Sequence, residues 1–169
     1  MNENKRKVAV IGFYALALII FLIFVYLEKR EYTAVDTRSA EEVEGVYTDM
    51  TDTAVFKTDT PVDSDYLALS GFAYWPQLEY KTIRYAVALR DCETNDYLII
   101  PSLVVDRPDL FKKHTDLIFE KVGFYGRISK KIGRFGERYY EICFLADINE
   151  NLHYIVHTGS FCGTPKEGE

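Results

Sequence analysis

The chain has 169 residues, a formal net charge of −6 and only three cysteines. The negative charge repels phosphate backbones and argues against nucleic-acid binding. Three cysteines form at most one intramolecular disulfide, which excludes a disulfide-stapled scaffold.

The first predicted element is an apolar segment, Val8–Leu27, that contains no charged residue. Its roughly 20 residues match the length that a helix needs to cross about 30 Å of hydrocarbon. Its apolar side chains leave no polar stripe on a helical wheel, and a segment in lipid must satisfy its own backbone groups. We therefore predict a single transmembrane helix that contacts the lipid bilayer through Val8–Leu27.

The flanking residues indicate whether this helix is cleaved and how it is oriented in the membrane. The apolar segment runs directly into the charged Glu28–Arg30 without a small-residue cleavage site, so we expect an uncleaved signal anchor. Residues 1–7 form a short tail with contiguous bases at Lys5, Arg6 and Lys7, whereas the bases after the span alternate with acids. This pattern favours a cell-membrane protein with a cytoplasmic N-terminus and an extracytoplasmic C-terminal domain.

Residues 28–45 are predicted to form a stem between the membrane and the domain. Within them, Ser39 precedes Glu42 by three residues, which is the spacing of a capping box, and Gly45 provides a stop. A short helix is expected there.

Residues 46–159 are predicted to form a mainly-β domain, because apolar residues alternate with polar ones. One helix is expected between strands, where Pro108 marks a first turn, and apolar residues with a histidine continue at helical spacing. Residues 160–169 are predicted to be a flexible tail. The segments expected to form the clearest strands are Ile83–Arg90, Tyr97–Ile100, Val122–Ile128, Tyr139–Leu145 and Leu152–Thr158, and the helical positions are Leu110, Phe111, His114, Leu117 and Ile118.

This order of elements predicts an α+β domain built on an antiparallel barrel. Gly123 and Gly126 inside one strand permit the bulges and sharp coiling of a small barrel. An OB-like barrel, with its helix between the third and fourth strands, is compatible with the order. Another small barrel or a sandwich fits equally well, and no motif in the chain identifies a family.

The chain offers few candidates for catalysis or metal binding. His153, His157 and Cys162 resemble a ligand set, but histidines four apart on a strand lie about 13 Å from each other, too far to share one ion. Ser160 lacks the surroundings of a nucleophile elbow, and no phosphate-binding motif occurs. We expect no catalytic residue, no metal and no cofactor, and hence no enzyme.

The pairing state of the cysteines is predicted from the geometry of the expected final hairpin. If its strands pair across Asp147–Asn151, Cys143 lies opposite Ile155 and should be a partly buried free thiol. Cys92 and Cys162 then remain the pair with freedom to meet.

Two groups of residues are candidates for ligand contact. An aromatic stretch is able to stack on a sugar ring if exposed, although core filling is the favoured interpretation. A basic loop follows the strand at Val122–Ile128 and suits an anionic partner. The residues concerned are Phe72, Tyr74 and Trp75 in the aromatic stretch, and Arg127, Lys130, Lys131 and Arg134 at the basic loop.

These features lead to two functional hypotheses. The first is a non-enzymatic, single-pass envelope protein whose domain binds another protein or assists a membrane complex. The alternative is a domain that binds an envelope glycan or anionic polymer through the aromatic stretch and the basic loop.

Overall fold

The computed structural model describes residues 3–31, 35–59, 62–63, 66–76, 78–79, 81–113 and 121–165. The chain divides into two compact units, Met1–Ala34 and Val35–Glu169.

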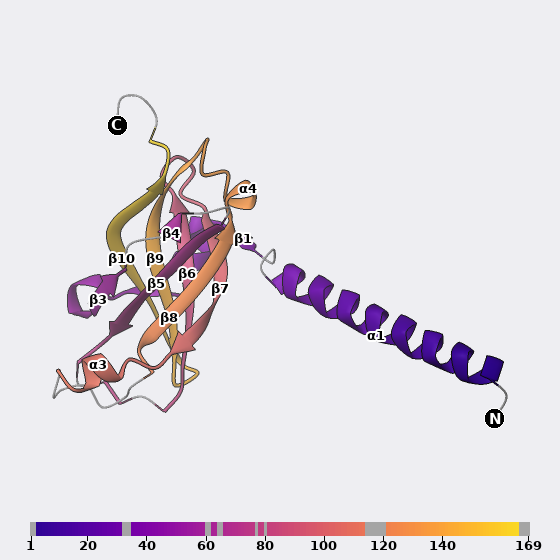
Figure 1. The fold of residues 1–169 in the computed structure, drawn as a ribbon. Helices are drawn as coiled ribbons and strands as arrows, with labels where there is room; N and C mark the ends of the chain where they lie inside the picture. Colours follow the sequence, from indigo (N-terminus) through magenta and orange to yellow (C-terminus); the bar gives the residue numbers. More distant parts are fainter. Residues whose placement is uncertain are drawn as a thin grey trace. The chain divides into compact units, whose positions relative to one another are not determined.

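The first unit is a single helix, α1 (Glu3–Glu31), drawn in indigo in Figure 1. Its large apolar side chains between Ile11 and Tyr26 are exposed, from 41% at Val25 to 70% at Phe13. The helix that the sequence predicts is thus confirmed. Among the residues that are described, no helix combines the length and the apolar content of a membrane span.

The second unit is mainly β, as predicted, and its helices are short. The strands are β1 (Asp36–Arg38), β2 (Thr48–Asp49), β3 (Val55–Thr58), β4 (Val62–Asp63), β5 (Tyr66–Tyr74), β6 (Ile83–Asp91), β7 (Tyr97–Val105), β8 (Gly123–Ser129), β9 (Tyr139–Ile148) and β10 (Leu152–Gly163). The helices are α2 (Ala40–Glu44), the 3₁₀ turn η1 (Thr51–Thr53), α3 (Pro108–Phe111) and α4 (Lys130–Gly133).

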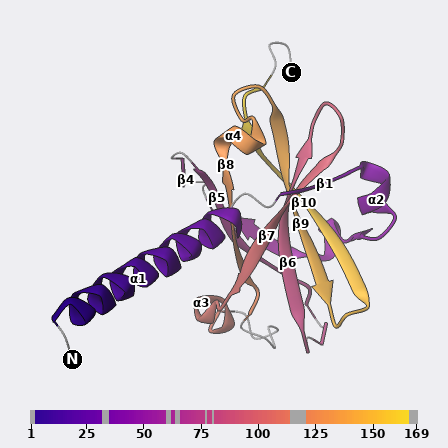
Figure 2. The ribbon, with the colours of Figure 1, turned by 90° about the vertical axis from the view of Figure 1, so that its right-hand side faces the viewer.

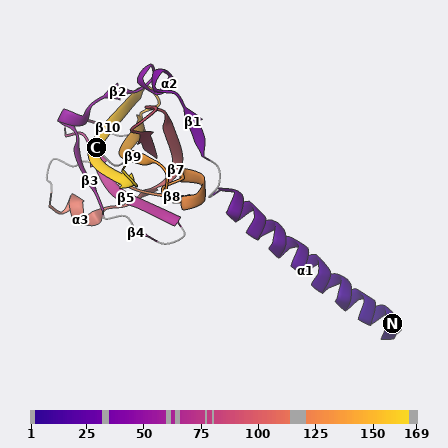
Figure 3. The same cartoon turned by 90° about the horizontal axis from the view of Figure 1, so that it is seen from above.

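The strands form two mostly antiparallel sheets that share β7. Along the path the order is β2-β10-β9-β6-β7-β8-β5-β3, with β1 added to β7 and β4 added to β5. We call the β1, β2, β6, β7, β9 and β10 side the first sheet, and the β3, β4, β5, β7 and β8 side the second sheet. Seen from above in Figure 3, the strands run around a common core.

The predicted barrel does not close, which corrects that part of the sequence analysis. β3 and β10 approach each other through a hydrogen bond between the hydroxyls of Thr58 and Ser160, 3.1 Å apart. β3 and β10 are not paired in a ladder, and part of the free edge of β10 is occupied by β2, which pairs with it at Tyr154 and Ile155. The Met50 N–H, next in the chain, also bonds to the Ile155 carbonyl. The architecture is therefore an open pair of sheets and not an OB-like barrel.

The main core lies between the two sheets. Phe124 of β8 faces Phe144 of β9 with ring centroids 4.2 Å apart, and Tyr85 of β6 packs 5.8 Å from Phe124. Rings from strands of both sheets thus meet at the centre of the domain. Such burial of apolar surface is the main force that holds the sheets together.

A second core covers the outer face of the first sheet. Val43 of α2 is fully buried there, against a cluster that includes Cys143, Leu145 and Ile155. Figure 2 shows α2 beside β1, β9 and β10. The helix has the predicted capping box, in which the Ser39 hydroxyl accepts the Glu42 N–H. Residues that the sequence assigned to a stem therefore contribute β1 and α2 to the packed unit.

The final hairpin is longer than predicted and has a different register. β9 continues to Ile148, so the turn contains only residues 149–151, and Cys143 lies opposite His157 instead of Ile155. β10 extends to Gly163 and pairs with β9 up to that point, which places the first four residues of the predicted tail in a strand.

The helix predicted after residue 106 begins where expected. α3 starts with Pro108 in its first turn and places Leu110 in a buried cluster with Phe72 and Tyr74. The predicted helical positions His114, Leu117 and Ile118 lie outside the described residues.

Candidate functional site

The site begins where β7 changes its partner. From Tyr97 to Pro101 this strand pairs with β6, whereas from Ser102 to Val105 it pairs with β8. Proline lacks a backbone N–H and is therefore suited to the end of a ladder. The two strands diverge beyond Pro101, and a gap opens beside the first residues of β6.

Side chains close the gap at the end nearest Ser102 and Gly126. The Ser102 hydroxyl accepts the Val87 N–H at 2.9 Å and donates to the Ile100 carbonyl at 3.0 Å, so it replaces a ladder bond. Gly126 lies opposite Ser102, and a Cβ there would stand 2.9 Å from the Ser102 hydroxyl. The close approach of the sheets at this point thus requires glycine.

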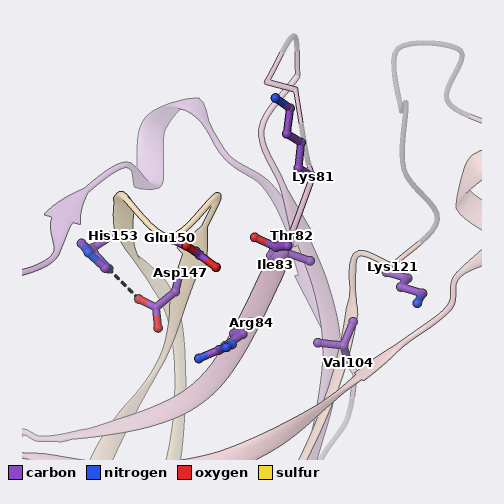
Figure 4. Close-up of a pocket in the computed structure, with 9 residues that line it drawn as sticks. All are labelled: Lys81, Thr82, Ile83, Arg84, Val104, Lys121, Asp147, Glu150 and His153. Carbon is purple, nitrogen blue, oxygen red and sulfur yellow. Dashed lines mark hydrogen bonds and ion pairs between the residues drawn. The ribbon is translucent and has the colours of Figure 1, made fainter.

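Below Ser102 the gap is a cleft of about 550 Å³, the size of a small-ligand site. Figure 4 shows Thr82, Ile83 and Arg84 on β6 and the turn before it, with the β9–β10 hairpin on one side and Val104 and Lys121 on the other. The lining residues are Lys81, Thr82, Ile83, Arg84, Val104, Lys121, Asp147, Glu150 and His153.

The charges around the cleft are arranged in two groups. On the hairpin side, the carboxylates of Asp147 and Glu150 line the cleft, and His153 Nδ1 lies 2.7 Å from the Asp147 carboxylate, which it faces across β9 and β10. Lys81, Arg84 and Lys121 form the other group, and within the described part of the chain none of these three side chains has an ion-pair partner. This second group therefore offers positive charge to an incoming anionic group, on the side of the cleft away from the two carboxylates.

Asn149 connects the β9–β10 hairpin, through side-chain hydrogen bonds, to residues 79–82 at the entrance of the cleft. Its side-chain oxygen accepts the N–H groups of Lys81 and Thr82 at 2.7 and 3.2 Å, and its amide donates to the Glu79 carbonyl at 2.6 Å. Asn149 has a positive φ of 53°, a conformation that asparagine tolerates better than most residues. The turn that sets the hairpin register thus also holds the start of β6.

The aromatic stretch predicted as a ligand surface lies in the interior. Phe72, Tyr74 and Trp75 are only 8%, 1% and 4% exposed. The Trp75 ring packs 5.0 Å from Tyr154, and its indole N–H donates to the Met50 carbonyl. Their ring faces contact protein neighbours and leave no open stacking surface.

The predicted basic residues lie at the other end of β8. Arg127 stacks over the Tyr66 ring at 4.0 Å, Lys130 and Lys131 belong to α4, and Arg134 ends α4 with a φ of 48°. Phe72 pairs with Gly123 at the start of β8, so the length of the strand, roughly 20 Å, separates it from the basic loop. The structure does not bring the two parts of this predicted site together.

The catalytic and metal candidates of the sequence are also dispersed. His153 contacts Asp147, whereas His157 contacts Glu141 and Cys143 further along β10. Cys162 lies opposite Tyr140 and joins the core between the sheets.

The cleft itself was missed by the sequence analysis, which ended a strand at Ile100. Pro101 within the apolar run Tyr97–Val105 was the available signal for a strand that changes partner. Comparison with family models, curated proteins and solved structures gives no match for this chain.

Proposed function

We propose that the chain is a single-pass membrane protein whose β domain lies outside the cytoplasm and binds an extended segment of a partner protein. The observation that carries the binding role is the cleft beside β6. No enzymatic step is part of the proposal.

The backbone of β6 supports this mode of binding. At Ile83, Arg84 and Tyr85 one edge pairs with β9, while on the other edge the ladder with β7 begins only at Ala86. Backbone groups alternate sides along a strand, so those of Ile83, which lines the cleft, point the same way as the Val87 N–H, towards the gap. A strand edge that borders a cleft and has no neighbouring strand in the ladder is suited to accept a further strand from a partner.

The charge around the gap indicates which segment would fit. Lys81, Arg84 and Lys121 line the cleft without carboxylate partners among the described residues, so acidic side chains on the incoming strand would neutralise them. A segment in which acidic and apolar residues alternate presents one kind of side chain to each face of the sheet. We therefore propose an extended, acidic partner segment.

The membrane anchor is proposed from the sequence and exposure of α1. Val8–Leu27 is uncharged, and the large apolar side chains between Ile11 and Tyr26 remain exposed on all faces of the helix. Apolar surface of this extent needs a nonaqueous environment or a partner to cover it. The basic tail at Lys5–Lys7 supports a cytoplasmic N-terminus.

The binding role is tested with peptides and the full-length protein in detergent micelles. A labelled peptide of about eight residues that alternates Val and Glu should bind in a fluorescence anisotropy titration. N-methylation of alternate amides removes donors worth about 1 kcal/mol each and should weaken binding on the order of 10- to 100-fold.

Two variants locate the binding at the cleft. Arg84→Glu should weaken the acidic peptide at least tenfold at low salt, while the matched reversal Arg134→Glu, at the basic loop, should have little effect. Equal binding of the N-methylated peptide, or of a peptide with Lys in place of Glu, would contradict the proposal.

The aromatic stretch gives no support to the glycan or anionic-polymer alternative. Phe72, Tyr74 and Trp75 are buried and lie at the other end of β8 from the basic loop.

A further inference from the structure

β9 and β10 bring three potential metal ligands together on the outer face of the first sheet. Glu141 and Cys143 are two residues apart on β9 and so share a face, and His157 lies directly opposite Cys143 on β10. One ligand atom from each residue, a carboxylate oxygen, a thiol sulfur and an imidazole nitrogen, lies within 4.8 Å of the other two.

An irregularity in β10 produces this convergence. After His157 the register is interrupted, and pairing resumes between Ser160 and Ile142, which leaves Thr158 and Gly159 without partners in the ladder. The Thr158 hydroxyl donates to the Ile142 carbonyl at 2.5 Å and accepts the Ser160 N–H at 3.1 Å, so the bulge is fixed in place. A bulge re-aims the neighbouring side chain, and His157 reaches both Cys143 and Glu141.

The distances match those around a tetrahedral metal ion. His157 Nδ1 lies 3.4 Å from Cys143 Sγ and 3.2 Å from Glu141 Oε2. Metal–ligand bonds of about 2.3 Å to sulfur and about 2.0 Å to nitrogen and oxygen place tetrahedral ligands roughly 3.6 and 3.3 Å apart. Two of the three ligand–ligand distances are therefore close to those of a tetrahedral site, and the third, from Cys143 Sγ to the Glu141 carboxylate, is at most 4.8 Å.

We propose that Glu141, Cys143 and His157 form a binding site for a zinc-like divalent cation. Thiolate, imidazole and carboxylate are the ligands that Zn²⁺ takes in proteins, and three protein ligands leave a fourth position for water or another donor. The site is separate from the cleft beside β6 and does not depend on the proposed partner binding.

Access favours a metal ion over nucleophilic catalysis by Cys143. Cys143 is 0% exposed, so its thiol is not open to a substrate. Both contacts of His157 also involve the same ring nitrogen, which prevents one partner from orienting the base for the other. A bare ion is able to enter past the side chains of His157 and Glu141, which are 25% and 14% exposed.

Neighbouring residues hold the ligands and set the local charge. The Thr51 hydroxyl accepts the His157 N–H at 2.9 Å and donates to the Asp49 carboxylate, which positions the His157 backbone. Arg90 Nη1 lies 3.6 Å from Glu141 Oε2 and competes with a cation for that oxygen. Within the described residues, the buried Nε of Arg90 has no hydrogen-bond partner.

The test is a titration of the full-length protein in detergent with Co²⁺ and then Zn²⁺. Co²⁺ bound to Cys143 should give a thiolate-to-metal charge-transfer band, which added Zn²⁺ removes. Zn²⁺ affinity, measured by competition with a chromophoric chelator, should fall at least tenfold in His157→Gln and in Glu141→Gln. The band should be lost in Cys143→Ser.

Matched variants separate this site from surface chelation. His153→Gln and Cys162→Ser should leave the Co²⁺ band and the Zn²⁺ affinity unchanged, whereas Arg90→Gln should increase the affinity because it removes the competing charge. Far-ultraviolet circular dichroism of each metal-free variant checks folding. If Cys143→Ser is unfolded, the Zn²⁺ affinities of His157→Gln and Glu141→Gln, whose side chains are partly exposed, test the site instead. Absence of a band in the folded wild-type protein, or equal losses in His153→Gln and His157→Gln, would overturn the proposal.

Discussion

At the residue scale, Asn149 links the turn of the final hairpin to the entrance of the cleft. One side chain accepts two backbone N–H groups and donates to one carbonyl in residues 79–82, and its own backbone has a positive φ. These two contributions, hydrogen bonding and tolerance of left-handed backbone, can be measured separately.

Asn149→Gly should lower the free energy of unfolding by about 2 kcal/mol, because it removes the hydrogen bonds but accepts the positive φ. Asn149→Ala should lower it by about 1 kcal/mol more, since alanine also strains the left-handed backbone. Urea unfolding measures the difference, and hydrogen exchange at the Lys81 and Thr82 amides reports the lost bonds.

The neighbouring Glu150 supplies the control for this series. It is exposed and has a φ of 65°, so Glu150→Gly should leave stability unchanged or raise it. Equal stability of the Gly and Ala variants at position 149 would show that backbone conformation contributes nothing there.

Asp91 is the second residue whose role can be tested, because it is buried yet charged. Burial acts to raise the pKa of its carboxyl, but the Glu93 N–H, the Arg138 guanidinium and the Thr94 N–H outweigh burial and hold the pKa below its usual value. A carboxyl with a lowered folded-state pKa stabilises the fold above its unfolded pKa of about 3.9, and this contribution is lost as the pH falls through the folded pKa.

Asp91→Asn should therefore cost about 2 kcal/mol at pH 7, and this cost should decrease as the pH falls below the unfolded-state pKa and through the lower folded-state pKa, as measured by urea unfolding at several pH values. We expect a moderate cost because the Arg138 side chain is 37% exposed and partly screened. Asp106→Asn, at an exposed position, should show neither effect. A loss that is the same at every pH would mean that the charge of Asp91 is not what stabilises the fold.

At the scale of elements, α2 shows how a helix of five residues persists. So short a helix is unstable alone, and two features compensate: the capping box at Ser39 and the burial of Val43 against the first sheet. The helix in turn covers Cys143, so its docking controls access to that thiol.

Val43→Ala should lower the free energy of unfolding by about 2 kcal/mol through the cavity it creates, and Ser39→Ala by about 1 kcal/mol through loss of the cap. Both should speed alkylation of Cys143 in the native protein, measured by mass spectrometry. Ser129→Ala is the matched control, because Ser129 begins α4 without a side-chain cap hydrogen bond. Unchanged alkylation in Val43→Ala would show that α2 does not cover the thiol.

Elements were more predictable from the sequence than their pairing. The helix over Val8–Leu27, the capping box at Ser39 and most strands follow from local pattern, which depends only on neighbouring residues. The register of β9 and β10 does not, because alternation defines a face but leaves the pairing open to shifts of two residues. That shift moved His157 opposite Cys143 and hid the metal-ligand cluster.

The open sheets and the cleft could not be predicted from the sequence for a similar reason. They depend on β7 changing partner at Pro101 and on β2 occupying the edge of β10, and both are contacts between distant parts of the chain. Local pattern does not specify such contacts.

At the scale of the whole molecule, the chain combines a helix with exposed apolar faces and a domain that buries its own core. The large apolar side chains between Ile11 and Tyr26 of α1 are at least 41% exposed, whereas 18 buried residues form the main core of the second unit. This contrast is the basis of the proposed membrane anchor.

The proposed anchor predicts how the full-length protein behaves in cells. Leu18→Arg combined with Ile19→Arg places two charges near the centre of the span, at a cost of about 3 kcal/mol each. The variant should be extracted by carbonate while the wild-type protein stays in the membrane fraction. The matched variant Leu18→Val with Ile19→Val should remain bound, because it keeps the segment apolar. Extraction of the wild-type protein, or equal retention of the arginine variant, would contradict the anchor.

Orientation requires a separate measurement, because basic residues lie beside both ends of the proposed span, at Lys5–Lys7 and at Lys29 and Arg30. With Lys5, Arg6 and Lys7 retained in the cytoplasm, a reporter that is active only outside the cytoplasm should be active when fused after Glu169. Protease added to intact spheroplasts should digest the β domain. Replacing the three bases with Gln, and adding three Lys after Arg30, should reduce or reverse this orientation, since the bias in positive charge then favours the other side. A domain that stays protected until lysis in the wild-type protein would place it in the cytoplasm, and the partner segment would then have to be sought there.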